Sequence, residues 1–124
     1  MTEKLIDPQA AVDFMIAKSK AYAIAEGNKT YMEELRKTIK AEQMIEAEEV
    51  GHKTAAMQER EAYASTRYRE HLLALRQAVE AREELRWMLI AAQARIEVWR
   101  SQEASNRAEG KQPYEIFYTK ALLM

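Results

Sequence analysis

Side chains with catalytic or metal-binding potential are few and scattered in this sequence. It contains two histidines, His52 and His71, and no cysteine, which excludes disulfides, thiol nucleophiles and thiolate metal sites. Glu49 and His52 have the Glu-x-x-His spacing of ligands in di-iron helical bundles. However, this pair occurs once, where such a site needs two, and Gly51 interrupts its helix. We therefore expect no metal and no other cofactor.

Carboxylates and arginines alternate in the middle of the chain. Six of them lie close together in the sequence: Arg76, Glu80, Arg82, Glu83, Glu84 and Arg86. Charges three and four residues apart are typical of an exposed helix face, and we favour that interpretation over catalysis by paired carboxylates. The sequence also has no Gly-rich phosphate loop and no local signature of a Ser-His-acid triad. It therefore predicts a protein that is not an enzyme and has no small-molecule substrate.

Cations and aromatic rings gather around residues 53–71. The cations are Lys53, Arg60, Arg67 and Arg69, and the rings interleaved with them are Tyr63, Tyr68 and His71. Single-stranded nucleic acid is bound by cations that contact phosphates and by rings that stack under bases. The four cations are therefore candidate nucleic-acid contacts. The alternative is a solvated turn with its tyrosines in the core.

A second basic and aromatic group lies further along the chain, with members Arg95, Trp99, Arg100 and Arg107. We interpret the two tryptophans, Trp87 and Trp99, as core or interface anchors rather than as platforms for base stacking. Trp99 and Arg100 are therefore candidate protein-interface residues.

The composition predicts that helices carry these groups. Ala, Glu, Arg, Lys, Leu and Met are common, and Gly and Pro are rare, which favours an all-α fold. Asp7-Pro8 is typical of a helix start, and we predict helix over 8–49. Gly27-Asn28 can end a first helix, and Thr30 to Glu33 can cap a second. One helix or a helix pair therefore remain equal alternatives for this part.

A short connecting helix over 54–64 and a long helix over 66–108 follow. Gly51 closes the preceding helix, and Thr54 caps the short one. Apolar residues of the long helix recur at spacings of three and four, with a register slip near Arg82: Tyr68, Leu72, Leu75, Val79, Leu85, Leu89, Ala92, Ile96 and Trp99. This pattern predicts a single helical domain, 1–124, built as an elongated, coiled-coil-like antiparallel hairpin.

An apolar tail, 111–124, comes after Gly110. Its candidate protein-interface residues are Ile116, Phe117, Leu122 and Leu123. Because so many apolar side chains are unfavourable in water, we expect this tail to dock on the same chain or on another subunit. We therefore predict a homo-oligomer.

The net charge of −1 gives no general attraction to nucleic acid or to anionic membranes. The first residues lack the apolar region of a signal peptide, and no apolar run reaches the roughly 18 to 20 residues that span a bilayer. We expect a soluble protein without a membrane partner that resides in the cytoplasm, which is the host cytoplasm if a phage encodes it.

Several runs of residues carry a resemblance to known proteins. They are GHKTAA at 51–56, EREAYAS at 59–65, Tyr68, and a long helix that bears LRW at 85–87 and ends in IEVWRS at 96–101. In these the chain resembles small helical proteins of phage and prophage early regions. Over residues 18 to 108 its layout is similar to that of the UvsY recombination mediators of T-even phages. These have early helices, a Lys-Thr connector and a long terminal helix that ends in a basic-plus-Ser element.

The resemblance implies an oligomeric accessory factor that holds single-stranded DNA and helps to load a recombinase against a single-strand-binding protein. Lys53 and Arg60 would contact DNA, and the region after Trp99 would mediate assembly. The balanced charge and the tail after Gly110 depart from this pattern. Two alternatives stay open. One is a phage effector that inhibits a host protein complex through the Trp99 surface and the tail. The other is a helical scaffold or chaperone-like oligomer without nucleic acid contact.

Overall fold

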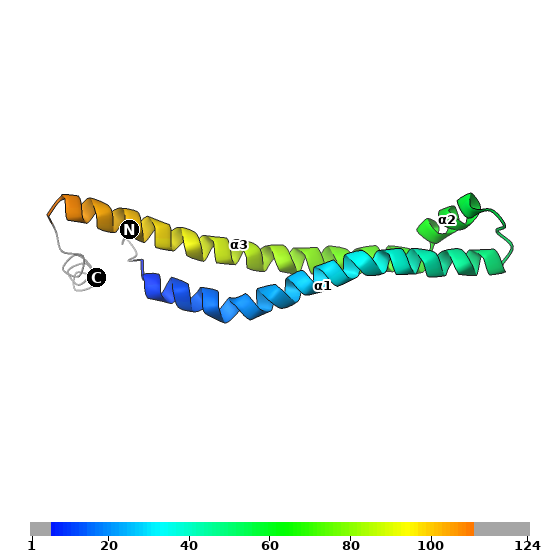
Figure 1. Ribbon diagram of the computed structural model, residues 1–124, viewed down its shortest axis with the longest axis horizontal. Helices are drawn as coiled ribbons and strands as arrows, with labels where there is room; N and C mark the ends of the chain where they lie inside the picture. The colour runs from blue at the N-terminus through cyan, green and yellow to red at the C-terminus, as the bar shows by residue number, and fades with distance from the viewer. Residues whose placement is uncertain (1–5, 111–124) are drawn as a thin grey trace. The chain divides into compact units, whose positions relative to one another are not determined.

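The computed structural model describes residues 6–110, which form three helices (Figure 1): α1 over Pro8–Glu49, α2 over Ala55–Ala64 and α3 over Thr66–Ala108. This part of the chain contains no strand, so the prediction of an all-α fold is confirmed. The predicted tail, with Ile116, Phe117, Leu122 and Leu123, lies outside the described residues.

The first helix begins as its sequence predicts and does not break at Gly27. The Asp7 carboxylate accepts hydrogen bonds from the backbone N–H groups of Gln9 and Ala10, at 3.0 and 3.1 Å, which satisfies donors that have no partner within the helix. Pro8 occupies the first helical position, where its missing N–H is not needed. One helix therefore spans 8–49. A lone internal glycine costs only about 1 kcal/mol, too little to end it.

Local motifs shape the connector between α1 and α3. Gly51 has a φ of +111°, its N–H bonds to the Glu48 carbonyl, and the His52 N–H bonds to the Ala47 carbonyl. This pair of bonds is a Schellman motif, which satisfies the last carbonyls of α1. The Thr54 hydroxyl caps α2 by accepting from the Met57 N–H at 3.2 Å. Ser65 ends α2, and its hydroxyl accepts from the Tyr68 N–H at 3.2 Å at the start of α3.

The chain forms two compact units, and α1 and α3 each contribute to both. The first unit comprises 1–20 and 86–124, of which 6–20 and 86–110 are described, and the second comprises 21–85. In the second unit, Glu26 meets Arg82 and Glu42 meets Arg67. Partners further along α1 therefore lie earlier on α3, which defines an antiparallel pair. In the first unit, Ala11 and Ala92 are buried and line one groove.

Helix α2 packs inside the second unit beside the ends of α1 and α3 that it joins (Figure 1). Its Ala62 is completely buried, and its Glu59 carboxylate lies 3.6 Å from the Lys40 amine of α1. A small side chain at Ala62 lets the backbones approach closely, and the ion pair ties α2 to α1. The short helix is therefore a packed part of this unit.

The face of α3 that is turned to α1 runs in alternating steps of four and three residues. In the second unit this inner seam comprises His71, Leu75, Ala78, Arg82 and Leu85, and in the first it continues with Leu89, Ala92, Ile96 and Trp99. All nine are buried or half-buried. The predicted register slip near Arg82 is wrong because Arg82 itself occupies a seam position. The predicted inward position of Leu72 is also wrong, since that side chain is 41% exposed.

The core of the described residues is thin. Its buried apolar members are Ala11, Ala25, Ile39, Ala47, Ala62 and Ala92. Within residues 6–110, no large side chain is fully buried. Burying a Leu, Ile or Phe side chain stabilises a fold by about 1.5 to 3 kcal/mol. Burying alanine contributes less, because its side chain is a single methyl group. The helices therefore leave much of their apolar surface in contact with solvent. No helix in the described part of the chain is long and apolar enough to cross a membrane.

Candidate functional site

The four candidate nucleic-acid contacts all belong to the second unit and are all exposed. Lys53 lies in the loop before α2, Arg60 lies on α2, and Arg67 and Arg69 lie in the first turn of α3. Lys53, Arg60 and Arg69 form no ion pair with other residues of the described range. Their charges therefore remain available to a ligand.

Arg67 is engaged differently from the other three. Its guanidinium pairs with the carboxylate of Glu42 on α1. It precedes the buried His71 by one helical turn and lies on the same side of α3, whereas Arg69 precedes His71 by two residues and lies on the opposite side. Arg67 therefore ties α3 to α1, and Arg69 faces solvent.

A shallow depression on α2 carries the aromatic part of the site. Ala56, Glu59, Arg60, Tyr63 and Ala64 line it, and the Tyr63 side chain is 48% exposed. Its apolar floor consists of small alanines, so the Tyr63 ring remains accessible. The depression therefore offers a ring and a cation side by side, together with the carboxylate of Glu59.

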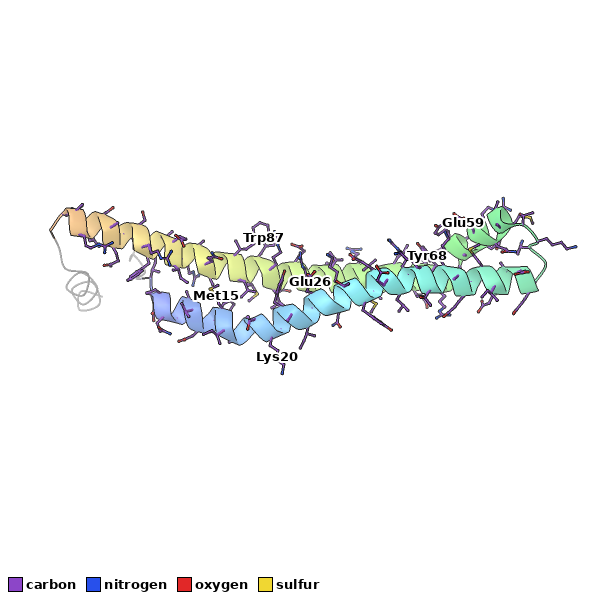
Figure 2. All side chains as sticks on the ribbon, viewed as in Figure 1. Met15, Lys20, Glu26, Glu59, Tyr68 and Trp87 are labelled. Carbon is purple, nitrogen blue, oxygen red and sulfur yellow. The ribbon has the colours of Figure 1, made fainter. Side chains whose placement is uncertain are left out.

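Lys40 of α1 contacts the Tyr63 ring, and the sequence pattern does not reveal this contact. Its amine lies 4.8 Å from the centroid of the Tyr63 ring and 3.6 Å from the Glu59 carboxylate. The hydrogen bond to Tyr63, followed by the charge of Glu59, raises the pKa of Lys40 above its usual value, although partial desolvation opposes the shift. Tyr68 packs edge-on against Tyr63, with centroids 5.2 Å apart. The ring is thus held in place from two helices (Tyr68 and Glu59 are labelled in Figure 2).

Electrostatics around the connector are mixed. Glutamates outnumber lysines and arginines over residues 40–71, and the His52 ring lies 4.0 Å from the Glu61 carboxylate. The attraction for a polyanion therefore depends on individual exposed cations such as Lys53, Arg60 and Arg69. Any binding to phosphates should weaken steeply as salt rises.

His71 is unavailable to a ligand, although the sequence places it among the aromatic residues of this site. It is 6% exposed, and its Nε2 lies 2.7 Å from the Met32 carbonyl oxygen, to which it donates as the Nε2–H tautomer. The role of His71 is therefore to fix α3 against α1. Its position in the inner seam, and not its residue type, is the sequence signal for that role.

Arg82 is the second polar member of the inner seam in this unit. Its guanidinium pairs with Glu26 of α1 and with Glu83, the latter at 2.6 Å, and lies 5.6 Å from the centroid of the Tyr22 ring. The hydrogen bond to Glu26 raises the pKa of Arg82, and the bond to Glu83 adds to this effect. Polar groups at seam positions allow only the alignment in which they meet their partners. These contacts select a helix register and need no catalytic explanation.

The candidate protein-interface residues of the first unit are split between two faces. Trp99 is half-buried at the end of the inner seam, whereas Arg100 is exposed and pairs with Glu97 at 3.1 Å. The exposed tryptophan is Trp87, at 59%, which points away from α1 in Figure 2. The sequence left a core or an interface position open for both tryptophans, and only the structure shows that Trp87 is the exposed one.

Trp87 begins a second apolar face of α3 that lies opposite the inner seam. This outer stripe comprises Trp87, Ile90, Ala94 and Val98, spaced by three or four residues, and all four are exposed. Ile90 and Val98 are 39% and 47% exposed. A helix with apolar residues on two opposite faces packs against a partner on each. The outer stripe has no such partner within the described chain.

No group of three or more His, Asp or Glu side chains within residues 6–110 could hold a metal ion. The chain matches no protein-family model, and neither curated proteins nor solved structures show a significant match to it. The chemistry of its surfaces must therefore be inferred from its own residues.

Proposed function

We propose that this protein acts by association: it is not an enzyme, it forms an oligomer through its helices, and it holds a macromolecular partner. The observation that carries this proposal is the exposed outer stripe of α3, combined with a core that buries mainly alanine. Large apolar side chains in regular helical register are unfavourable in water. Another helix packed against the outer stripe would bury these side chains, and the simplest source of that helix is a second copy of the protein.

Substitution of Val98 tests the assembly. Val98→Glu places a charge in the outer stripe, and we expect it to shift the protein toward the monomer in light scattering coupled to size exclusion. Gln93→Glu is the matched control, because Gln93 is also exposed on α3 but lies away from the stripe. If Val98→Glu and Gln93→Glu leave the same oligomer, the outer stripe is not the contact.

Single-stranded DNA is the partner that the connector chemistry favours. Lys53, Arg60 and Arg69 have free charges, and Arg60 lies beside the accessible ring of Tyr63. Cations for phosphates and a ring for stacking are the elements of sequence-tolerant single-strand binding. These groups and the resemblance to recombination mediators support an accessory role in DNA recombination or replication. In that role the oligomer would present several copies of the site to one DNA strand. It would also contact a recombinase or a single-strand-binding protein.

Binding of a labelled single-stranded oligonucleotide across a salt series tests this role. Lys53→Glu combined with Arg60→Glu should weaken binding. If both residues contact phosphates, the slope of log affinity against log salt should fall by about 0.7 per lost contact. Lys18→Glu with Lys20→Glu makes the same charge change on α1 in the first unit and should have little effect. Absence of binding by the unmodified protein at low salt would exclude the DNA role.

A protein target is the second candidate, and the acidic surroundings of the connector favour it. Excess glutamate over residues 40–71 repels polyanions, while the outer stripe can bind an apolar surface on another protein. In this case the protein is an effector that inhibits a host complex, or a scaffold without nucleic acid contact. A protein that is oligomeric but fails to bind DNA at low salt is the outcome expected for this alternative.

A further inference from the structure

A row of exposed side chains lies on α1 within the second unit. Its members, which we call the α1 row, are Ile24, Tyr31, Thr38 and Ile45. They recur at intervals of seven residues, close to two helical turns, so they share one side of the helix. Ile24, Tyr31 and Ile45 are 55%, 64% and 57% exposed. A strict seven-residue repeat is typical of a helix that packs along its length against another helix.

The α1 row does not face the helices that α1 contacts in this unit. Ile39, which is 4% exposed, marks the buried side of α1. Thr38 precedes Ile39 by one residue and therefore lies about 100° around the helix from it. Lys40, whose amine pairs with Glu59 of α2, follows Ile39 and lies about 100° to the other side. The row is therefore on the flank of α1 that α2 leaves uncovered.

The residue types of the α1 row are similar in both directions. An isoleucine stands at each end, and a side chain with a hydroxyl group occupies each inner position. A second α1 that runs antiparallel places Ile24 opposite Ile45 and Tyr31 opposite Thr38. Apolar groups then meet apolar groups, and hydroxyls meet hydroxyls. The row is thus self-complementary, as a two-fold contact between identical chains requires.

Charges beside the centre of the α1 row favour this antiparallel arrangement. The Lys37 amine lies 3.4 Å from the Glu34 carboxylate, and the two side chains are 74% and 68% exposed. An antiparallel copy reverses their order, so that Glu34 of each chain comes near Lys37 of the other. A parallel copy in the same register places like charges level with each other, which is unfavourable. Glu42, also on this side of α1, is already paired with Arg67.

We propose that the α1 row packs antiparallel against the α1 row of a second copy, as a contact separate from the outer stripe of α3. Gly27 and Ala41 border the row and are small, which leaves room for Tyr31 and Ile45 of the copy. The proposal rests on the proposed oligomer and extends it. A chain with two self-complementary contacts binds two neighbours, so the assembly is larger than a dimer.

The absence of cysteine allows a direct test in the full chain. Ile24→Cys is mixed with mass-tagged Ile45→Cys in glutathione buffers of graded redox potential. Both chains also carry Val98→Glu, so that the outer stripe does not contribute. We expect the effective concentration of thiols in the mixed disulfide to be at least ten times that in either self-disulfide. In the antiparallel pair, two copies of residue 24 are about 31 Å apart at 1.5 Å per residue.

Glu46→Cys in place of Ile45→Cys is the matched control, because Glu46 is exposed but turned about 100° from Ile45. Equal effective concentrations for Ile45→Cys and Glu46→Cys would overturn the proposal. Self-disulfides of Ile24→Cys that match or exceed the mixed product would also overturn it. If the unmodified protein is an oligomer in light scattering, these results reject the α1 row alone. A strict monomer rejects the proposed oligomer as well.

Exchange of charges between two chains gives an independent readout in the same Val98→Glu background. Glu34→Lys and Lys37→Glu should each weaken association, because they place like charges at the centre of the contact. An equimolar mixture sets two lysines against two glutamates, and its dissociation constant should be at least about threefold lower than that of either variant alone. Arg76→Glu mixed with Glu80→Lys is the control, since this exposed pair lies on α3. Equal gains in both mixtures would show general charge attraction and contradict the proposed contact.

Discussion

At the scale of single residues, position within the helix matters more than residue type. His71 is typical of a ligand-binding side chain, yet its place in the inner seam buries it against the Met32 carbonyl. Trp87 and Trp99 are chemically identical, yet one is exposed and the other is half-buried. The sequence identified the available cations Lys53, Arg60 and Arg69 but not Lys40, whose contact with Tyr63 depends on the packing of α2 against α1.

Removing the buried histidine should weaken the helix pair of the second unit. We expect His71→Ala to lower the free energy of unfolding by about 2 kcal/mol, because it loses a hydrogen bond and leaves a small cavity. Chemical denaturation followed by circular dichroism measures this change. Gln77→Ala, at an exposed position of α3, should leave stability almost unchanged. Equal effects of the two substitutions would contradict the role of His71.

At the scale of elements, the helix ends were predictable and the continuity of α1 was not. Caps at Asp7, Thr54 and Gly51 depend on hydrogen bonds within a few residues, so the local sequence specifies them. Gly27 is different, because the free energies of a helix that breaks there and of a continuous helix differ by only about 1 kcal/mol. Packing of α1 against α3 on both sides of the glycine decides that balance, and no local pattern reports it.

Two glycine substitutions should therefore have opposite effects. Gly27→Ala places a methyl group in open space inside a helix, and we expect it to stabilise the protein by about 0.5 to 1 kcal/mol. Gly51→Ala also meets no neighbouring atom, but the φ of +111° at this position disfavours any side chain. It should be destabilising. Thermal denaturation of the two variants would reveal the contrast, and a destabilising Gly27→Ala would mean that α1 is interrupted there.

At the scale of the whole molecule, the exposed apolar surface of α3 is the basis of the proposal that the protein associates. Alanine dominates the core of the described residues, while Trp87, Ile90 and Val98 remain exposed in helical register. The helical periodicity predicted the long helices and their antiparallel pairing, whereas the prediction of an oligomer came from the apolar tail and stays a prediction. It chose the inward face correctly from Leu85 to Trp99, but it did not report Trp87, Ile90 and Val98 as a second apolar face, because it followed only one periodic set.

The mass of the unmodified protein in solution tests the central claim most directly. One chain has a mass of 14.4 kDa. Light scattering coupled to size exclusion, over a range of micromolar concentrations, should give at least twice that value, and Val98→Glu should return it toward a single chain. A mass of one chain at every concentration would contradict association through the outer stripe, and with it the proposal that this protein works as an oligomer.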